Sequence, residues 1–325
     1  MKCIRLLSVV VALFGFTVVG SAQTLQEVIE SYNKGASLQA SGDLSGAIAE
    51  LERCVELAKK VGEEAEEQLI VLEANLPGMY LQNAKNILNA KNFPAALLAL
   101  EATVAAAEKY NNAGIKAEAE KNIPQIYLAM GMADYQDKKY NEAIANFDKV
   151  VALDPNQARA YFIRGACYQQ LNDTPKMEES YKLAIEKGPV GGDAASAQSA
   201  KTQLSRFYFN TGVTAQKTQK WDDAIAAFTK TVEVDNQNAD AFYALASCYN
   251  SKKSWDNAIS NAEKALELKS GGDPKDLERI YYQLGTSYME KKDNGKACEY
   301  YKKVTTDTNF LPTAKHHIEV TLKCK

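Results

Sequence analysis

Histidine and cysteine are the residues of this chain best suited to metal binding or catalysis near neutral pH. The two histidines, His316 and His317, are adjacent in the sequence. Neighbouring residues on a helix point in different directions, so they do not form a metal-binding pair, and we interpret both as surface residues. The chain contains no nucleophile elbow, Walker loop, dinucleotide glycine motif or zinc-protease helix. We therefore predict a protein that is not an enzyme and that has no catalytic residue, metal ligand or cofactor.

The cysteines indicate packing more than chemistry. One of the six, Cys3, lies in the N-terminal segment described below, and the other five are an odd number, which leaves at least one thiol unpaired unless chains cross-link. Three of them fill small, inward-facing positions and are predicted to be buried apolar residues: Cys54, Cys167 and Cys248. Cys298 and Cys324 could meet where the last helix packs, although the spacing alone does not decide this. No Cys-x-x-Cys motif is present, so metal and redox chemistry are not expected.

An internal sequence repeat indicates which helices position the side chains of this chain. The pattern of residues 127–155 recurs at residues 161–189, thirty-four positions further along. The matching pairs are Tyr127 and Tyr161, Gly131 and Gly165, Phe147 and Tyr181, and Pro155 and Pro189. A glycine inside a helix costs about 1 kcal/mol relative to alanine, which is tolerable if it lets a second helix approach closely. The alanines expected at the same contact from the opposite helix are Ala143, Ala224, Ala258 and Ala297.

This spacing and these residue types resemble the tetratricopeptide repeat, a helix-turn-helix unit that stacks into a superhelix. The resemblance implies an all-α protein, a right-handed α-solenoid of about seven such units followed by a C-terminal capping helix. One helical hairpin cannot bury its apolar face alone, so neighbouring hairpins must cover it.

The glycine and alanine positions place the solenoid over residues 23–325, with repeats starting near residues 28, 77, 124, 158, 205, 239 and 278. Three intervals exceed thirty-four residues by about four helical turns, which predicts longer first helices. The turns expected before those helices lie at Gly62, residues 111–114 and residues 191–192. Pro77 and Pro124 fall inside two of these helices, where we predict a bend or a short break.

The end of the chain predicts a closing helix over about residues 312–323. Its apolar stripe consists of Ala314, Ile318 and Leu322, spaced four residues apart, with charged residues beside it. This arrangement would face the stack on one side and solvent on the other, as the end of a solenoid requires.

Residues 1–22 are typical of a secretory signal peptide. Lys2 and Arg5 form a basic start, an apolar run follows, and residues 20–22 are small. The apolar run is shorter than the ~20 residues that a membrane-spanning helix needs. We predict that the segment is cleaved, that no transmembrane segment remains, and that the protein is exported to the periplasm of a Gram-negative cell or associates with its envelope. The alternative is that the segment is kept as a membrane anchor.

The charge of the chain argues against nucleic acid as a partner. Its 38 basic and 41 acidic residues give a net charge of −3, and without Lys2 and Arg5 the net charge is −5. Nucleic-acid binding proteins need a concentrated basic face.

In the family that this chain resembles, the first helices line a concave groove that binds peptides. The resemblance places one large apolar or aromatic residue of each first helix on that face: Tyr32, Leu81, Leu128, Phe162, Phe209, Tyr243 and Tyr282. Further contacts are expected from Met132 and from polar side chains on the same face: Gln169, Gln216, Asn250, Arg159, Arg206 and Arg279. Chaperone-binding members of the family hold a carboxylate with a lysine and an asparagine, but the lysine position is aromatic or leucine throughout this chain, so we do not expect that clamp. The alternative is that the rings only pack between adjacent first helices.

We therefore predict a non-enzymatic, exported scaffold or adaptor that binds a partner protein or peptide in its concave groove, in envelope assembly, secretion or transport. The alternative is a self-assembling or membrane-tethered spacer protein. The oligomeric state is left open by the sequence.

Overall fold

The computed structural model describes residues 21–325, and no β-strand occurs in that range. The chain divides into two compact units, Met1–Asp134 and Tyr135–Lys325. The predicted signal segment lies outside the described residues except for its last two positions, which begin the first helix. Within residues 21–325 no helix is both long and apolar enough to cross a membrane.

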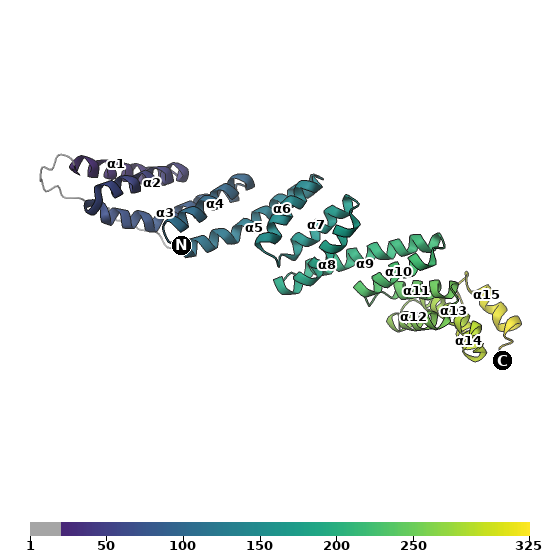
Figure 1. The fold of residues 1–325 in the computed structure, drawn as a ribbon. Coiled ribbons are helices and arrows are strands. Elements are labelled where there is room, and N and C mark those ends of the chain that lie inside the picture. Colours follow the sequence, from purple (N-terminus) through teal and green to yellow (C-terminus); the bar gives the residue numbers. More distant parts are fainter. Residues whose placement is uncertain (1–20) are drawn as a thin grey trace. The chain divides into compact units, whose positions relative to one another are not determined.

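Helical hairpins form both units (Figure 1). The first unit contains α1 (Ser21–Ala40), α2 (Leu44–Val61), α3 (Glu66–Asn89), α4 (Phe93–Lys109) and most of α5 (Ala113–Gln136). The second contains α6 (Tyr140–Leu153), α7 (Ala158–Gln170), α8 (Thr174–Gly191), α9 (Ala194–Lys217), α10 (Trp221–Val234), α11 (Ala239–Ser251), α12 (Trp255–Leu268), α13 (Pro274–Glu290), α14 (Asn294–Tyr301) and α15 (Leu311–His316). The pairs α1–α2, α3–α4, α7–α8, α9–α10, α11–α12 and α13–α14 pack directly against each other.

Close approach at a glycine explains the packing inside a hairpin. A Cβ atom added to Gly165 would lie 2.7 Å from Cδ1 of Tyr181 on the second helix of the hairpin. The same contact occurs between Gly212 and Phe228, and between Gly285 and Tyr301. Ala143 and Ala224, which make the corresponding approach from second helices, are fully buried, as predicted.

The turns inside the hairpins share one backbone conformation. One turn residue adopts a left-handed conformation in each of six hairpins, with φ between 58° and 64°: Lys91, Lys138, Asn172, Gln219, Lys253 and Lys292. In several hairpins an aspartate or asparagine then starts the second helix by accepting a backbone hydrogen bond. Asp173, for example, accepts from the Lys176 N–H, and Asp293 from the Lys296 N–H. Such caps satisfy N–H groups that have no partner within the helix.

Three first helices are long, as the intervals predict: α3, α5 and α9 have 24 residues each. Of the predicted bend or short break at Pro77 and Pro124, the break does not occur, because α3 and α5 continue through both prolines. Both rings are buried in the packing, which stabilises the helix against the loss of one hydrogen bond. Pro189 likewise lies inside α8. The matching proline of the preceding repeat, Pro155, instead follows the end of α6 at Leu153.

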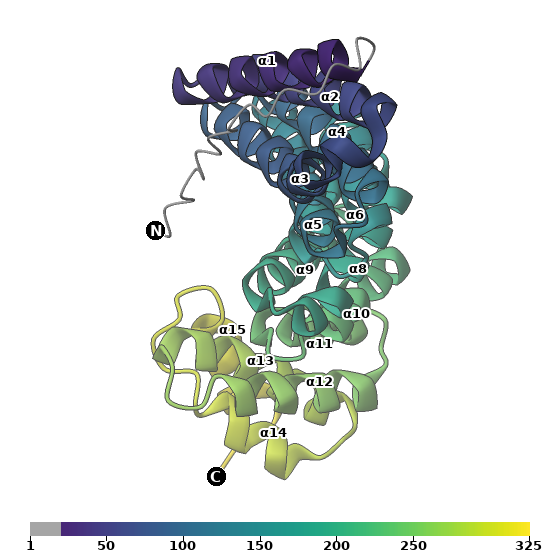
Figure 2. The same ribbon diagram turned by 90° about the vertical axis from the view of Figure 1, so that its left-hand side faces the viewer.

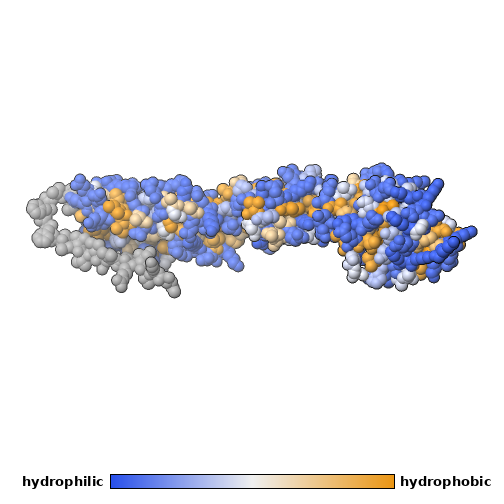
Figure 3. All heavy atoms as spheres, turned by 90° about the horizontal axis from the view of Figure 1, so that it is seen from below, coloured by the Kyte–Doolittle hydropathy of each residue, from blue (hydrophilic) through white to orange (hydrophobic). Residues whose placement is uncertain are grey.

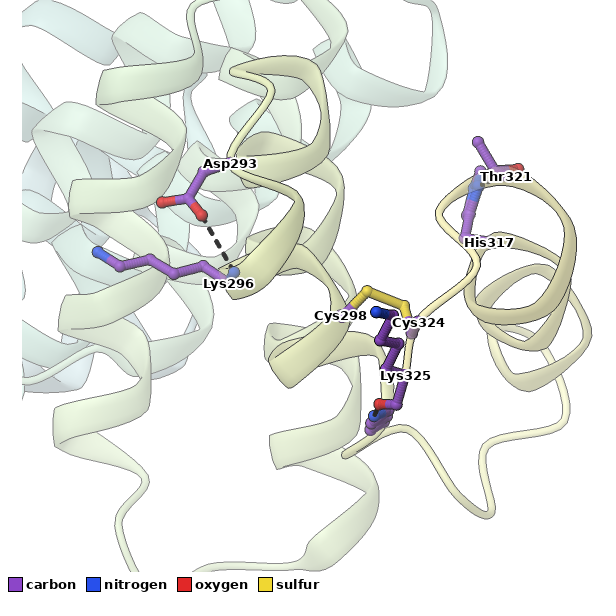
Figure 4. The surroundings of a disulfide bond; sticks show 8 residues. Asp293, Lys296, Cys298, His317, Thr321, Cys324 and Lys325 are labelled. Atoms are coloured by element: carbon purple, nitrogen blue, oxygen red, sulfur yellow. Dashed lines mark hydrogen bonds between the residues drawn. A yellow bond between two sulfur atoms is a disulfide. The ribbon is translucent and has the colours of Figure 1, made fainter.

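The C-terminal region differs from the expected single helix. α15 is only six residues long and continues into a π-helical turn, His317–Thr321, after which the chain returns to α14. A disulfide joins Cys298 of α14 to Cys324, with 5.7 Å between their Cα atoms (Figure 4). The pairing that the sequence left open is therefore formed. Cys54, Cys167 and Cys248 are free and buried, as predicted. Ala314 is buried, and Ile318 and Leu322 pack partly against the core of α13 and α14.

Candidate partner-binding face

Four rings mark the side of the first helices in the second unit: Phe162 of α7, Phe209 of α9, Tyr243 of α11 and Tyr282 of α13. We call this side the first-helix face. All four rings are half-buried. Three of them pack against the second-helix ring that contacts the glycine of the same hairpin. The centroids are 6.0 Å apart for Phe162 and Tyr181, 5.4 Å for Phe209 and Phe228, and 5.8 Å for Tyr282 and Tyr301. Each ring therefore supports its own hairpin and keeps part of its surface accessible.

The corresponding residues of the first unit and of α5 are less exposed than predicted. Leu81 is 4% and Leu128 is 8% exposed, so neither side chain is presented to a partner. A leucine has no polar atom to keep at the surface, and burial of its whole side chain is favourable. Tyr32 is half-buried against the core of α2 and α3, and Met132 is also half-buried.

The polar positions on the first-helix face are largely occupied by internal hydrogen bonds. Gln169 accepts a bond of 3.0 Å from the Tyr181 hydroxyl. Gln216 donates a longer bond of 3.4 Å to the Ser247 hydroxyl. We expected both side chains to be available to a peptide backbone, and Gln169 instead completes the packing of its own hairpin.

Asn250 has the largest number of internal partners among these polar residues. Its amide nitrogen donates to the backbone carbonyl and side-chain oxygen of Gln283, at 3.2 Å and 2.8 Å. Its side-chain oxygen accepts a bond of 2.6 Å from the Ser287 hydroxyl. These hydrogen bonds join α11 to α13, so Asn250 has a structural role, and its contact with a partner stays a prediction. Burial raises the pKa of Tyr243, and the neighbouring Gln283 side chain lowers it in part.

The three arginines of this face have different environments. Arg159 and Arg206 are exposed, and within residues 21–325 neither forms an ion pair with a carboxylate. Arg206 donates a hydrogen bond to Gln203. Arg279, in contrast, pairs with Asp276 and lies over the Tyr243 ring, 5.6 Å from its centroid. Of these three arginines, Arg159 and Arg206, each three residues before Phe162 or Phe209, are therefore the two without a carboxylate partner among the described residues.

The C-terminal region lies against Tyr282, which sequence reasoning did not foresee. The Phe310 ring lies 4.7 Å from the Tyr282 ring, and Figure 2 shows α15 beside α13. Burial raises the pKa of Tyr282, and hydrogen bonds from Thr286 and Thr313 lower it in part. The available signal in the sequence was Glu278, a carboxylate at the repeat start where the other six repeats have an uncharged residue. The structure shows it buried, and a buried carboxylate requires hydrogen-bond donors nearby.

His317 is not a free surface residue, contrary to our prediction. Its ring stacks on Tyr301 with centroids 5.0 Å apart, and burial together with His316 lowers its pKa. His316 is exposed. In the part of the chain that the structure describes, no group of three or more His, Cys, Asp or Glu residues could hold a metal ion.

Apolar and polar residues are interspersed on the face that Figure 3 shows, so the apolar surface there is divided into small areas. This distribution resembles ordinary protein surface more than one large apolar patch.

Comparison with known proteins identifies the repeat. Residues 124–172 match a family described as TPR repeat, and residues 209–273 and 278–306 match families described as tetratricopeptide repeat. Human DnaJ homolog subfamily C member 7 is 26% identical over 198 residues, which are 58% of this chain and 37% of the relative. The Hsp70-Hsp90 organising protein of Plasmodium falciparum is 22% identical over 189 residues, which are 58% of this chain and 27% of the relative.

Among solved structures, that of YrrB, titled as a TPR protein with an unusual peptide-binding site, is 20% identical with a TM-score of 0.33. The matched region covers 61% of this chain and 94% of the YrrB chain. The chain spans about a third of the length of the curated relatives it matches. The three matched segments agree with the helical hairpins described above, and this all-α chain carries tetratricopeptide repeats.

Proposed function

We propose that this chain is an exported, non-enzymatic scaffold that binds a partner protein or peptide through the first-helix face of α7 and α9. One observation carries the proposal. Phe162 and Phe209 are half-buried on neighbouring first helices, and each has an exposed arginine, Arg159 or Arg206, three residues before it on the same helix.

Aromatic rings and arginines are the residue types that contribute most to binding energy in protein interfaces. A half-buried ring is already held by its neighbours, so a partner that covers it loses little side-chain entropy. The guanidinium groups of Arg159 and Arg206 offer several donors each to carboxylates or carbonyls of the partner.

A scaffold role agrees with one of the relatives. The Plasmodium protein is named for organising two other proteins, Hsp70 and Hsp90. Because this chain spans only 27% of that relative, its partner has to be found independently.

Two features support export. The N-terminal residues have the basic, apolar and small-residue order of a signal peptide. Cys298 and Cys324 form a disulfide, and disulfides persist mainly in oxidising compartments such as the periplasm. We place the role in envelope assembly, secretion or transport.

Partner capture tests the proposed face. The intact chain is crosslinked in the native envelope, and bound proteins are identified by mass spectrometry. Phe162→Ala with Phe209→Ala should reduce capture of the identified partner at least tenfold, because two ring contacts are lost. The matched control replaces two exposed apolar residues elsewhere, Leu153→Ala and Val190→Ala, which are 56% and 70% exposed. Equal capture by the ring variant and the control would refute the proposed face.

Export is tested separately. The intact mass of the protein purified from the periplasm should match a chain that begins at Gln23. A mass that retains residues 1–22, with recovery in the membrane fraction, would instead support the tethered spacer. Light scattering of the purified chain then shows whether it assembles with itself.

A further inference from the structure

The last repeat is covered by a segment of the chain itself. We define the closing segment as residues 305–324, which follow α14 and include α15 and the π-helical turn. It lies against α13, on the side where the other first helices present their rings. Three independent contacts hold it there.

The first contact is an anchor on Glu278, the buried carboxylate at the start of α13. One carboxylate oxygen accepts from the Thr305 and Thr306 hydroxyls, each at 2.9 Å. The other accepts from the backbone N–H groups of Thr306 at 2.9 Å and Asp307 at 2.7 Å. Burial raises the pKa of Glu278, but these hydrogen bonds outweigh it and lower the pKa to about 2. A buried carboxylate is therefore fully satisfied by donors from the closing segment.

The second contact is aromatic. Phe310 packs on Tyr282, and His317 stacks on Tyr301, the ring beneath Tyr282. Ile318 and Leu322 add apolar contacts to the same core. The segment thus covers the α13 position that corresponds to Phe162 and Phe209.

The third contact is covalent. The disulfide between Cys298 and Cys324 fixes the end of the segment to α14, and the Lys302 ammonium donates to the backbone carbonyl of Lys325 beside it. Figure 4 shows the bond joining the helix to the returning chain. Cys298 and Cys324 are only half-buried, so a thiol reagent can reach them.

We propose that the closing segment is an intramolecular ligand that occupies the first-helix face of α13, and that the disulfide retains it there. The face beneath it is a latent peptide site. It fits a segment of the same chemistry, in which a turn with hydroxyl and backbone N–H donors binds Glu278 and an aromatic residue a few positions later packs on Tyr282. The biological role of this latent site rests on the proposed function, in which the chain binds a partner protein or peptide. The experiments that test the site use only this chain and a synthetic peptide.

Release of the segment follows thiol–disulfide exchange with an added dithiol such as dithiothreitol. A thiolate of the reagent attacks one sulfur and breaks the bond between Cys298 and Cys324. Its second thiolate then displaces the protein sulfur, so the reagent becomes a cyclic disulfide. Cys298 and Cys324 each take up a proton and end as thiols. Among the described residues the other cysteines, Cys54, Cys167 and Cys248, are free thiols, so the reagent cleaves no further disulfide there.

Hydrogen exchange tests whether the disulfide retains the segment. The oxidised intact chain is compared with the dithiol-treated chain and with a Cys298→Ser and Cys324→Ser variant. Closure of a loop of this size predicts roughly 100-fold faster exchange of residues 305–322 in both open forms. Exchange of α13 around Tyr282 should also increase, while α7 to α10 stay unchanged. Unchanged protection of residues 305–322, or an increase throughout the second unit, would overturn the proposal.

Binding of the segment in trans tests the latent site. The probe is a synthetic, fluorescein-labelled peptide of residues 305–322, measured by anisotropy. In the intact Cys298→Ser and Cys324→Ser chain that also carries Phe310→Ala, binding should be saturable and at least tenfold tighter than to the oxidised natural chain. Adding Tyr282→Ala should remove that gain, whereas adding Leu153→Ala should not.

Circular dichroism first establishes that each variant has the helical content of the natural chain. Equal peptide binding by the open and oxidised forms, or no binding by a folded open form, would contradict the latent site. Failure of partner capture at Phe162 and Phe209 leaves both of these measurements interpretable, so the two proposals can fail separately.

Discussion

The first-helix face of α7 and α9 and that of α11 and α13 are built on the same hairpin and differ in what surrounds the ring. Phe162 and Phe209 pack on a second-helix ring and have exposed arginines nearby. Tyr243 and Tyr282 lie among hydrogen-bonding groups, and Tyr282 is covered by Phe310. One position in the repeat can therefore either remain available to a partner or become part of the packing.

The difference arises from a few polar atoms. Asn250 and Gln283 join α11 to α13 through two hydrogen bonds, whereas Gln216 reaches α11 through one longer bond. A tyrosine hydroxyl can enter such a network, and a phenylalanine cannot. The polar network thus converts part of the binding face of the repeat into an internal contact.

The shared scaffold gives the largest expected effect. Gly165→Ala and Gly285→Ala should each lower the free energy of unfolding by about 2 kcal/mol, because the new Cβ would lie 2.7 Å or 2.8 Å from a buried ring. Denaturant unfolding followed by circular dichroism measures both. Gly78→Ala is the matched control, because nothing lies within 4 Å of its Cβ position, and it should stabilise α3 by up to ~1 kcal/mol. A large difference between Gly165 and Gly285 would show that the two hairpins are not equivalent.

The polar network gives the next effect. Asn250→Ala should cost about 2 kcal/mol of unfolding free energy, because it leaves polar groups of the buried residues Gln283 and Ser287 without their partner. Gln216→Ala, at the same position of the preceding repeat, should cost roughly 0.5 kcal/mol because its bond is long. Equal losses in the two variants would remove the distinction between the two parts of the face.

The covered part of the face should also respond to pH. The pKa of Glu278 falls from an ordinary value of 4.5 to about 2 in the folded chain. Its contribution to stability is present above pH ~4.5 and is lost as the pH falls toward 2, because the unfolded chain takes up the proton first. The unfolding midpoints of the natural chain and of Glu278→Gln should therefore converge over this range. A gap that is constant with pH would contradict the role of the ionised carboxylate.

The smallest effect comes from single hydroxyl groups. Tyr243→Phe should cost at most about 1 kcal/mol of unfolding free energy, because its hydroxyl loses the interaction with the Gln283 side chain that influences its pKa. Phe162→Tyr adds a hydroxyl to a half-buried ring and should change stability by less than ~0.5 kcal/mol. The pair of variants shows whether the network, and not the ring, distinguishes the two parts of the face.

The sequence was sufficient for most of the fold, because repeat positions carry strong steric requirements. Gly165, Ala143 and the turn before each long helix could be placed from spacing alone. The prolines could not, since continuation of α3 and α5 through Pro77 and Pro124 depends on burial in the final packing. The length of the closing helix also depended on a tertiary contact, the return of Cys324 to Cys298.

The site was less predictable than the fold. A repeat position gives the direction of a side chain but not what covers it, so Phe162 and Tyr282 were equivalent in sequence. Leu128 was taken for a surface residue although it is buried, and Asn250 for a free amide although it joins two helices. These outcomes depend on residues tens of positions away, such as Gln283 and Phe310.

The left-handed turns of the hairpins bear on how far the stability of this solenoid can be engineered. Six turns place a lysine, asparagine or glutamine where glycine has no steric penalty. Each lysine or glutamine at this position destabilises the native chain by about 1–2 kcal/mol. A glycine replacement removes this penalty, but part of the gain is lost because glycine increases the conformational entropy of the unfolded chain. Replacing them by glycine one turn at a time would yield a graded series of chains with increasing melting temperatures and unaltered helix faces.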